Sequence, residues 1–137
     1  MSYFSKGLVL AATLSLFGGS AMAEDSPETV DGATTVTVEE AVVLFDEEVV
    51  FVDVRKTSDF DAGRIAGAVH LDIKSALTEE SLAAVVAKDE PVLFYCNGVS
   101  CHRSAQASAL AVGWGYSKVY YLRNGYPAWE ISGNMIE

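Results

Sequence analysis

Both cysteines of this 137-residue chain lie in one short polar stretch, which also contains a histidine and an arginine. Cys96 opens the stretch, Cys101 lies inside it, and six residues separate Cys96 from Arg103. The thiolate is the reactive form of cysteine, and neighbouring positive charge lowers the pKa of a thiol. A permanently charged guanidinium can also hold an oxyanion through two parallel hydrogen bonds. The stretch therefore predicts an anion-binding loop in which Cys96 is a nucleophile that forms a covalent intermediate on sulfur.

The rest of the loop would form the binding surface. Gly98 allows the backbone to curl, so that consecutive N–H groups can converge on an anion. Helix-forming residues begin at Ser104, and the N-terminus of that helix would add positive potential beside the loop. We therefore assign catalysis to Cys96, and substrate binding to Asn97, Gly98, Val99, Ser100, Cys101, His102 and Arg103.

Short apolar runs that alternate with helical patterns must position this loop. Continuous apolar runs are expected for strands of a parallel sheet that is buried on both faces. Five strands are expected, at 35–36, 49–52, 68–71, 92–95 and 118–122. Helices are expected after the N-caps Thr37 and Thr78, and at 57–62, 104–114 and 126–131. The pattern predicts a single α/β domain with a five-stranded parallel sheet flanked by helices.

Three polar residues outside the loop also follow or occupy expected strands. Asp53 and Arg55 come at the carboxyl end of the second strand, where α/β folds place their sites. Two interpretations of this pair stay open, namely support for the active loop or a structural salt bridge. His70 fits a packed, hydrogen-bonded residue better than a catalyst. Asp53 and Arg55 are therefore the supporting candidates outside the loop.

The first 23 residues are predicted to be a signal peptide. Lys6 precedes a short apolar run at 7–17, and Ala21-Met22-Ala23 supplies the small residues of a cleavage site. Cleavage is expected after Ala23, which makes the protein periplasmic or secreted; the alternative is an uncleaved membrane anchor. Residues 24–34 are acidic and are expected to be a flexible leader, and the folded domain is expected at 35–137.

The charge of the chain restricts its partners. Loss of Lys6 with the signal peptide would move the formal net charge from −10 to −11. An acidic domain binds nucleic acid and anionic lipid poorly, so we expect no nucleic-acid partner and no stable membrane association after signal removal. A site for an anionic substrate must then be local, built from backbone N–H groups and one or two arginines.

Three segments resemble the rhodanese-like sulfurtransferases, and the resemblance spans Thr37 to Gly133. The first is Asp53-Val54-Arg55 with the later Gly63-Arg64-Ile65-Ala66-Gly67-Ala68, the second is Tyr95-Cys96-x-Gly98 … Arg103-Ser104, and the third is Val119-Tyr120-Tyr121-Leu122-Arg123-Asn124-Gly125-Tyr126-Pro127-Ala128-Trp129. Their order and spacing together match the family.

The resemblance implies a five-stranded parallel sheet with the active loop after its central strand, and a ping-pong reaction. Cys96 would take a sulfane sulfur from a small anionic donor such as thiosulfate and become a persulfide. It would then pass the sulfur to a thiol or another thiophile, while loop N–H groups and Arg103 hold the donor. No cofactor and no metal is implied, and no protein partner is identified.

The loop also departs from the family pattern. It is two residues longer than the common C-x-x-G-x-R-S loop, Cys101 lies inside it, and Arg64 replaces the usual histidine of its segment. Cys101 is either a resolving thiol or a small residue with no redox role. Two other functions stay open: a thiol–disulfide redox protein that uses Cys96 and Cys101, and a non-catalytic sulfur-binding module.

Three further chemistries fit the loop less well. The C-x4-C-H spacing of Cys96, Cys101 and His102 is a stretched haem-attachment pattern, but no obvious distal ligand exists. A zinc site would need more ligands than the single other histidine supplies. Phosphatase relatives generally carry five residues between the cysteine and the arginine, and this loop carries six.

Overall fold

A computed structural model describes residues 24–137 of the chain. The signal peptide that the sequence predicts at 1–23 lies outside the described residues. Within residues 24–137, no helix is both long enough and apolar enough to span a bilayer.

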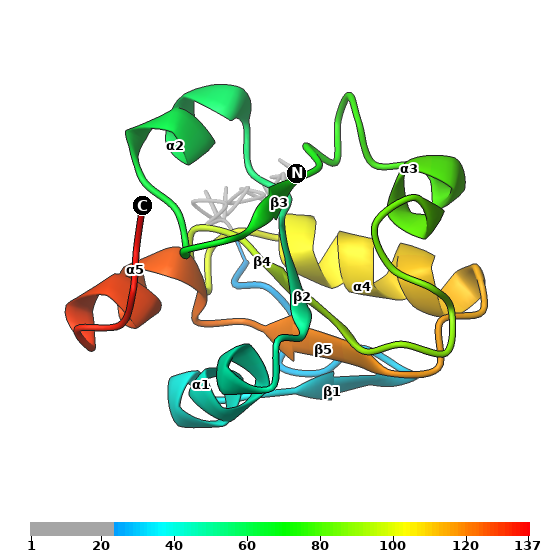
Figure 1. Cartoon of the computed structure of the whole chain (residues 1–137), viewed down its shortest axis with the longest axis horizontal. Helices are drawn as coiled ribbons and strands as arrows, with labels where there is room; N and C mark the ends of the chain where they lie inside the picture. The colour runs from blue at the N-terminus through cyan, green and yellow to red at the C-terminus, as the bar shows by residue number, and fades with distance from the viewer. Residues whose placement is uncertain (1–23) are drawn as a thin grey trace, which may run out of the picture.

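Five parallel strands form one sheet in the order β1-β5-β4-β2-β3 (Figure 1). They are β1 (Ala33–Thr35), β2 (Val50–Asp53), β3 (Val69–His70), β4 (Val92–Tyr95) and β5 (Val119–Leu122). All four residues of the central strand β4 are buried, as its unbroken apolar run predicts. The predicted fold class is confirmed, and the loop that carries Cys96 leaves the middle of the sheet.

Within residues 24–137, four helices connect consecutive strands: α1 (Val38–Asp46), α2 (Thr57–Ala62), α3 (Glu79–Ala83) and α4 (Arg103–Gly113). A fifth helix, α5 (Gly125–Ile131), follows β5. Both predicted N-caps are confirmed. The hydroxyl of Thr37 accepts a hydrogen bond from the Glu40 amide at 3.1 Å, and that of Thr78 accepts one from the Ser81 amide at 3.0 Å. These caps fix where α1 and α3 begin, and therefore where the connections from β1 to α1 and from β3 to α3 end.

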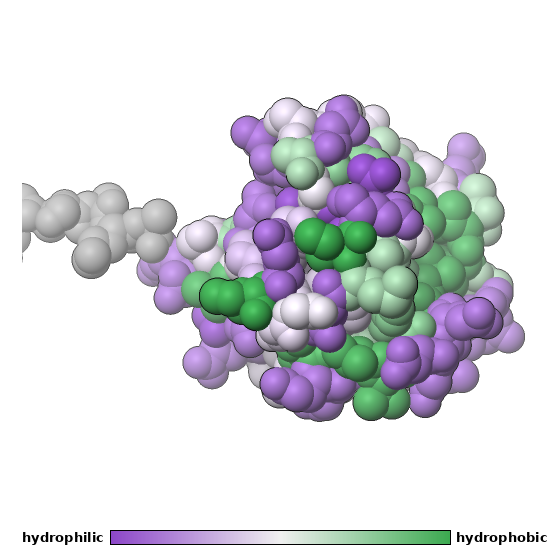
Figure 2. All heavy atoms as spheres, turned by 60° about the vertical axis from the view of Figure 1, so that its left-hand side comes forward, coloured by the Kyte–Doolittle hydropathy of each residue, from purple (hydrophilic) through white to green (hydrophobic). Residues whose placement is uncertain are grey.

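Two buried clusters lie on the two faces of the sheet. On one face, Phe94 and Cys96 pack with residues of α3 and α4. On the other, Leu93 and Tyr95 pack with residues of α1 and α5, including Trp129. Successive residues of a strand point to opposite faces, which explains why Tyr95 and Cys96 enter different clusters. On the face shown in Figure 2, hydrophobic residues reach the surface in patches between hydrophilic ones.

The acidic segment that the sequence predicts to be a leader contacts the folded domain. Its backbone lies against the folded domain: the Tyr121 hydroxyl donates to the Pro27 carbonyl at 2.9 Å, and the Arg123 guanidinium donates to the Ser26 carbonyl at 2.7 Å. β1 begins at Ala33, inside the segment assigned to the leader, because it pairs with β5. These partners lie far along the chain, where the local composition of the leader does not reveal them.

Candidate active site

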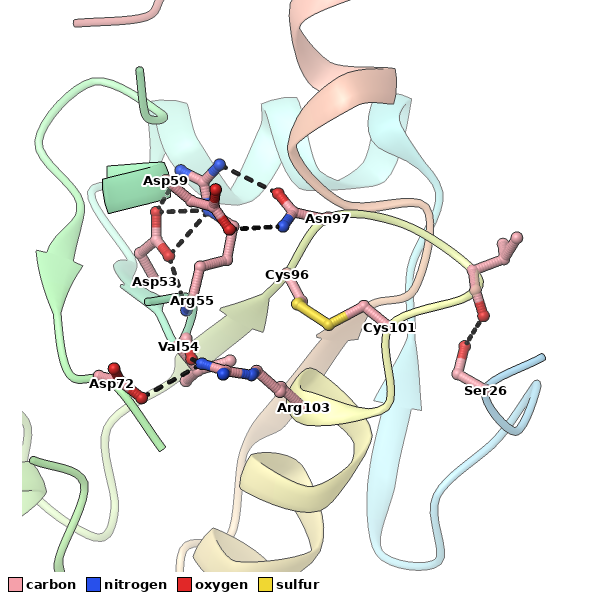
Figure 3. Close-up of a disulfide and its surroundings, with 11 residues drawn as sticks. Ser26, Asp53, Val54, Arg55, Asp59, Asp72, Cys96, Asn97, Cys101 and Arg103 are labelled. Carbon is pink, nitrogen blue, oxygen red and sulfur yellow. Dashed lines mark hydrogen bonds and ion pairs between the residues drawn. A yellow bond between two sulfur atoms is a disulfide. The ribbon is translucent and has the colours of Figure 1, made fainter. Parts of the chain in front are cut away.

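Cys96 lies immediately after β4, at the carboxyl edge of the sheet, and its side chain is 1% exposed. It forms a disulfide with Cys101, which is partly exposed and packs against the rim of the same buried cluster (Figure 3). In this state Cys96 carries no thiolate. The nucleophile that the sequence predicts therefore becomes available only when the disulfide is reduced.

The backbone of the loop is fixed by contacts other than the disulfide. Within the loop, the Cys101 amide donates to the Gly98 carbonyl at 2.9 Å. From outside, the Tyr126 amide donates to the Cys96 carbonyl at 2.8 Å. Gly125 has a φ of +67°, and a Cβ atom built there would lie 2.6 Å from the Gly98 nitrogen. Gly125 is thus required both by its backbone conformation and by its close approach to the loop.

Asn97 is held by two side chains that come from the region after β2. Its amide oxygen accepts from the Arg55 guanidinium at 3.1 Å, and its amide nitrogen donates to the Asp59 carboxylate at 2.9 Å (Figure 3). Both bonds engage the residue next to Cys96. They therefore position the start of the loop relative to the sheet.

Arg55 and Asp53 form a buried ion pair, with side chains 3% and 0% exposed. The Asp53 carboxylate accepts from the guanidinium at 2.7 to 3.1 Å and from the Tyr95 hydroxyl at 2.7 Å. Burial and the neighbouring Asp53 charge raise the pKa of Tyr95. Burial alone would lower the pKa of Arg55, but the hydrogen bond and charge of Asp53 outweigh it and raise that pKa. The pair is buried, and through Arg55 it also reaches Asn97.

Arg103 lies at the start of α4, but its guanidinium extends toward β2 and the segment after β3 (Figure 3). It donates to the Val54 carbonyl at 3.3 Å and to the Asp72 carboxylate at 3.2 Å. The Asp72 charge partly compensates that of Arg103, so the positive potential beside the disulfide is smaller than the sequence predicts.

The leader covers the far side of the loop. The amide and the hydroxyl of Ser26 each donate to the Val99 carbonyl at 2.7 Å, and Ser26 is only 2% exposed. The exposed His102 side chain contacts the Glu24 carbonyl at 2.7 Å, while Ser100 is exposed. The structure thus gathers all the predicted loop residues at one edge of the sheet. It adds Ser26 from the leader, for which no local sequence pattern provided a signal.

A polar cavity of about 520 Å³ adjoins the loop at Asn97. Arg55, Asp59 and Tyr126 line it together with Glu130 and Glu137. Its carboxylates make it an unfavourable place for an anion. Residues 24–137 contain no group of three or more histidine, cysteine or acidic side chains arranged to hold a metal ion.

His70 is packed and hydrogen-bonded, as predicted. Its Nε2 lies 2.8 Å from the Arg55 carbonyl oxygen, and its ring stacks on Phe60 at 4.4 Å between centroids. Trp129, in α5, is 1% exposed and packs in the core against Phe45 of α1.

Comparison with known proteins shows similarity to one domain family and to several solved structures. The model of the rhodanese-like domain matches residues 37–132. The thiosulfate sulfurtransferase GlpE of Pseudomonas entomophila is 37% identical over 96 residues, which cover 69% of this chain and 83% of that protein. The BH2092 protein of Bacillus halodurans superposes with a TM-score of 0.68 at 18% identity, over 77% of each chain. The human single-domain sulfurtransferase TSTD1 superposes with a TM-score of 0.62 at 22% identity, over 72% of this chain and 96% of that one.

Proposed function

The chain belongs to the rhodanese-like domain family, and we propose that it is an exported sulfurtransferase that works through a persulfide on Cys96. The donor is a small anion with a sulfane sulfur, of the thiosulfate type, and the acceptor is a thiol. The observation that carries the proposal is the position of Cys96, at the end of the central strand and at the head of a loop that runs into the N-terminus of α4.

The first half-reaction begins with the reduced loop. The Cys96 thiolate attacks the sulfane sulfur of thiosulfate, the sulfur–sulfur bond of the donor breaks, and sulfite leaves with the electron pair. Backbone N–H groups of the loop and the positive end of the α4 dipole stabilise the negative charge on the donor and then on the persulfide. In the second half-reaction, an acceptor thiolate takes the outer sulfur and Cys96 leaves as a thiolate.

Arg103 contributes to donor binding by exchanging partners. In the disulfide form its guanidinium is paired with Asp72, at 3.2 Å, and the two side chains are 21% and 14% exposed. A partly exposed ion pair of this kind is worth only about 1 kcal/mol. An incoming oxyanion can therefore compete with Asp72 for the same guanidinium.

Export is part of the proposal. The predicted signal peptide supports it, and so does a disulfide between the two cysteines of the chain, because such bonds persist in oxidising compartments. Detection of the mature N-terminus at Glu24 in a periplasmic or culture fraction would test it. Recovery of the uncleaved chain in the cytoplasmic fraction would contradict it.

The chemistry is tested on reduced protein from which the reductant has been removed. Thiosulfate should release one equivalent of sulfite from the wild type, and Cys101→Ser should retain one added sulfur atom, measured by intact mass. Cys96→Ser should do neither. Absence of sulfite from both the wild type and Cys101→Ser would overturn the proposal.

A second candidate function is thiol–disulfide exchange alone, which the Cys96–Cys101 disulfide favours. Both functions use the reducible disulfide at the end of β4. Thiol–disulfide exchange requires no release of sulfite from thiosulfate, whereas sulfur transfer does, so the same experiment separates the two functions.

A further inference from the structure

The two sulfur atoms of the disulfide are unequally accessible. Cys96 is 1% exposed and packs in the cluster between the sheet and α4, whereas Cys101 is partly exposed at the rim of that cluster. Thiol–disulfide exchange requires an incoming thiolate to reach the sulfur that it attacks. An external thiol therefore attacks Cys101, and Cys96 is the leaving group. Attack in this direction delivers the buried cysteine as the thiolate that sulfur transfer needs.

The loop is also held so that the two cysteines stay together after reduction. The Val99 carbonyl, midway between them, accepts two hydrogen bonds from Ser26 at 2.7 Å. Asn97 is fixed by Arg55 and Asp59, and the Cys101 amide donates to Gly98. None of these contacts depends on the disulfide. A thiol that is held next to its target reacts with a high effective concentration, so Cys101 is positioned to attack Cys96.

We propose that Cys101 is a second catalytic residue, which resolves the Cys96 persulfide and makes the protein release its sulfur as hydrosulfide. The inference rests on the proposed function, because it requires the persulfide to form. It extends that function by assigning an internal acceptor for the sulfur and a reduced product.

The resolving step balances within the loop. The Cys101 thiolate attacks Cys96 Sγ, a new bond joins the two cysteine sulfurs, and the bond from Cys96 Sγ to the outer sulfur breaks. Hydrosulfide leaves with the electron pair and takes up a proton as the pH requires. The sulfane sulfur is reduced, the two cysteines are oxidised, and the disulfide of the structure is restored.

A thiol reductant completes the cycle. One thiolate attacks the sulfur of the partly exposed Cys101 and releases Cys96, and a second thiol then attacks the mixed disulfide and releases Cys101. Over one cycle, thiosulfate and two thiols give sulfite, hydrosulfide and one external disulfide. The disulfide form of the structure is then the resting state of the cycle.

A single-turnover experiment on the mature protein tests the inference. The protein is reduced with dithiothreitol, freed of reductant under anaerobic conditions, and mixed with thiosulfate without an acceptor. Wild type should release one equivalent each of sulfite and hydrosulfide, and its intact mass should fall by two hydrogen atoms as the disulfide re-forms. Cys101→Ser should release sulfite but no hydrosulfide, and should keep one added sulfur atom. Cys101→Ala serves as a second variant with the same expectation.

The outcomes separate the resolving role of Cys101 from the proposed sulfur transfer by Cys96. If the wild type releases sulfite but retains the added sulfur and yields no hydrosulfide, Cys101 is not a resolving thiol, although the proposed function stands. If hydrosulfide also appears from Cys101→Ser, the internal attack is likewise refuted. If neither the wild type nor the variants release sulfite, the proposed function itself fails.

Discussion

The contact between the leader and the active loop can be tested at Ser26. Ser26→Ala removes the hydroxyl that donates to the Val99 carbonyl at 2.7 Å, but it keeps the backbone amide that donates to the same oxygen. The carbonyl therefore keeps a partner, and the loss is that of one net hydrogen bond, about 1 kcal/mol. For a domain of this size, that corresponds to a fall in Tm of roughly 4 °C.

Ser132→Ala is the matched control for Ser26→Ala. Its hydroxyl also donates to a backbone carbonyl, that of Ala128, at 2.7 Å, but Ser132 is exposed and follows α5. We expect a change within about 0.5 kcal/mol for this variant. Thermal unfolding of both variants in the disulfide form, followed by circular dichroism, measures the difference.

The same variants should also differ in the single-turnover reaction. A less firmly held Val99 carbonyl lets the loop move Cys101 away from Cys96, so Ser26→Ala should release hydrosulfide more slowly than the wild type. Ser132→Ala should match the wild type. Equal stability and equal hydrosulfide release in Ser26→Ala and the wild type would refute the view that the leader holds the loop.

Three other sites give measurable predictions. Arg55→Met leaves the Asp53 charge buried and unpaired, so the free energy of unfolding in urea should fall by about 3–5 kcal/mol; a loss under 1 kcal/mol would contradict this. The pKa of Tyr95 is raised in the folded state, so the protonated hydroxyl stabilises the folded protein fully below the ordinary pKa of 10, and this contribution is lost as the pH rises above that value. Tyr95→Phe should therefore weaken the fall in the free energy of unfolding at alkaline pH. Asp72→Asn frees Arg103 for the donor, and the KM for thiosulfate should fall about fivefold, whereas an unchanged KM would argue against partner exchange.

The sheet and its caps were predictable from the sequence because their determinants are local. The apolar runs of β2 and β4 are continuous, which is the pattern of strands covered on both faces. Thr37 precedes a glutamate at the third helical position, and the capping box forms as expected. The position of Cys96 after the central strand followed from the resemblance to the family, since the run before it could not by itself place β4 in the middle.

The partners of the site residues were not predictable, because they come from distant parts of the chain. The sequence assigned Arg103 to an oxyanion, but Asp72, from the segment after β3, lies opposite it. Asn97 was assigned to the substrate, yet both ends of its amide are bound by Arg55 and Asp59. Spacing along one loop does not reveal such contacts. For the same reason, the sequence did not decide whether Cys96 and Cys101 form a disulfide.

The central claim is that Cys96 carries sulfur as a persulfide, and one measurement tests it most directly. Reduced Cys101→Ser is exposed to thiosulfate, and intact mass and peptide mapping then locate any added sulfur. The account predicts a gain of one sulfur atom on Cys96, together with one equivalent of sulfite. No gain, or the same gain in a protein that also carries Cys96→Ser, would contradict it.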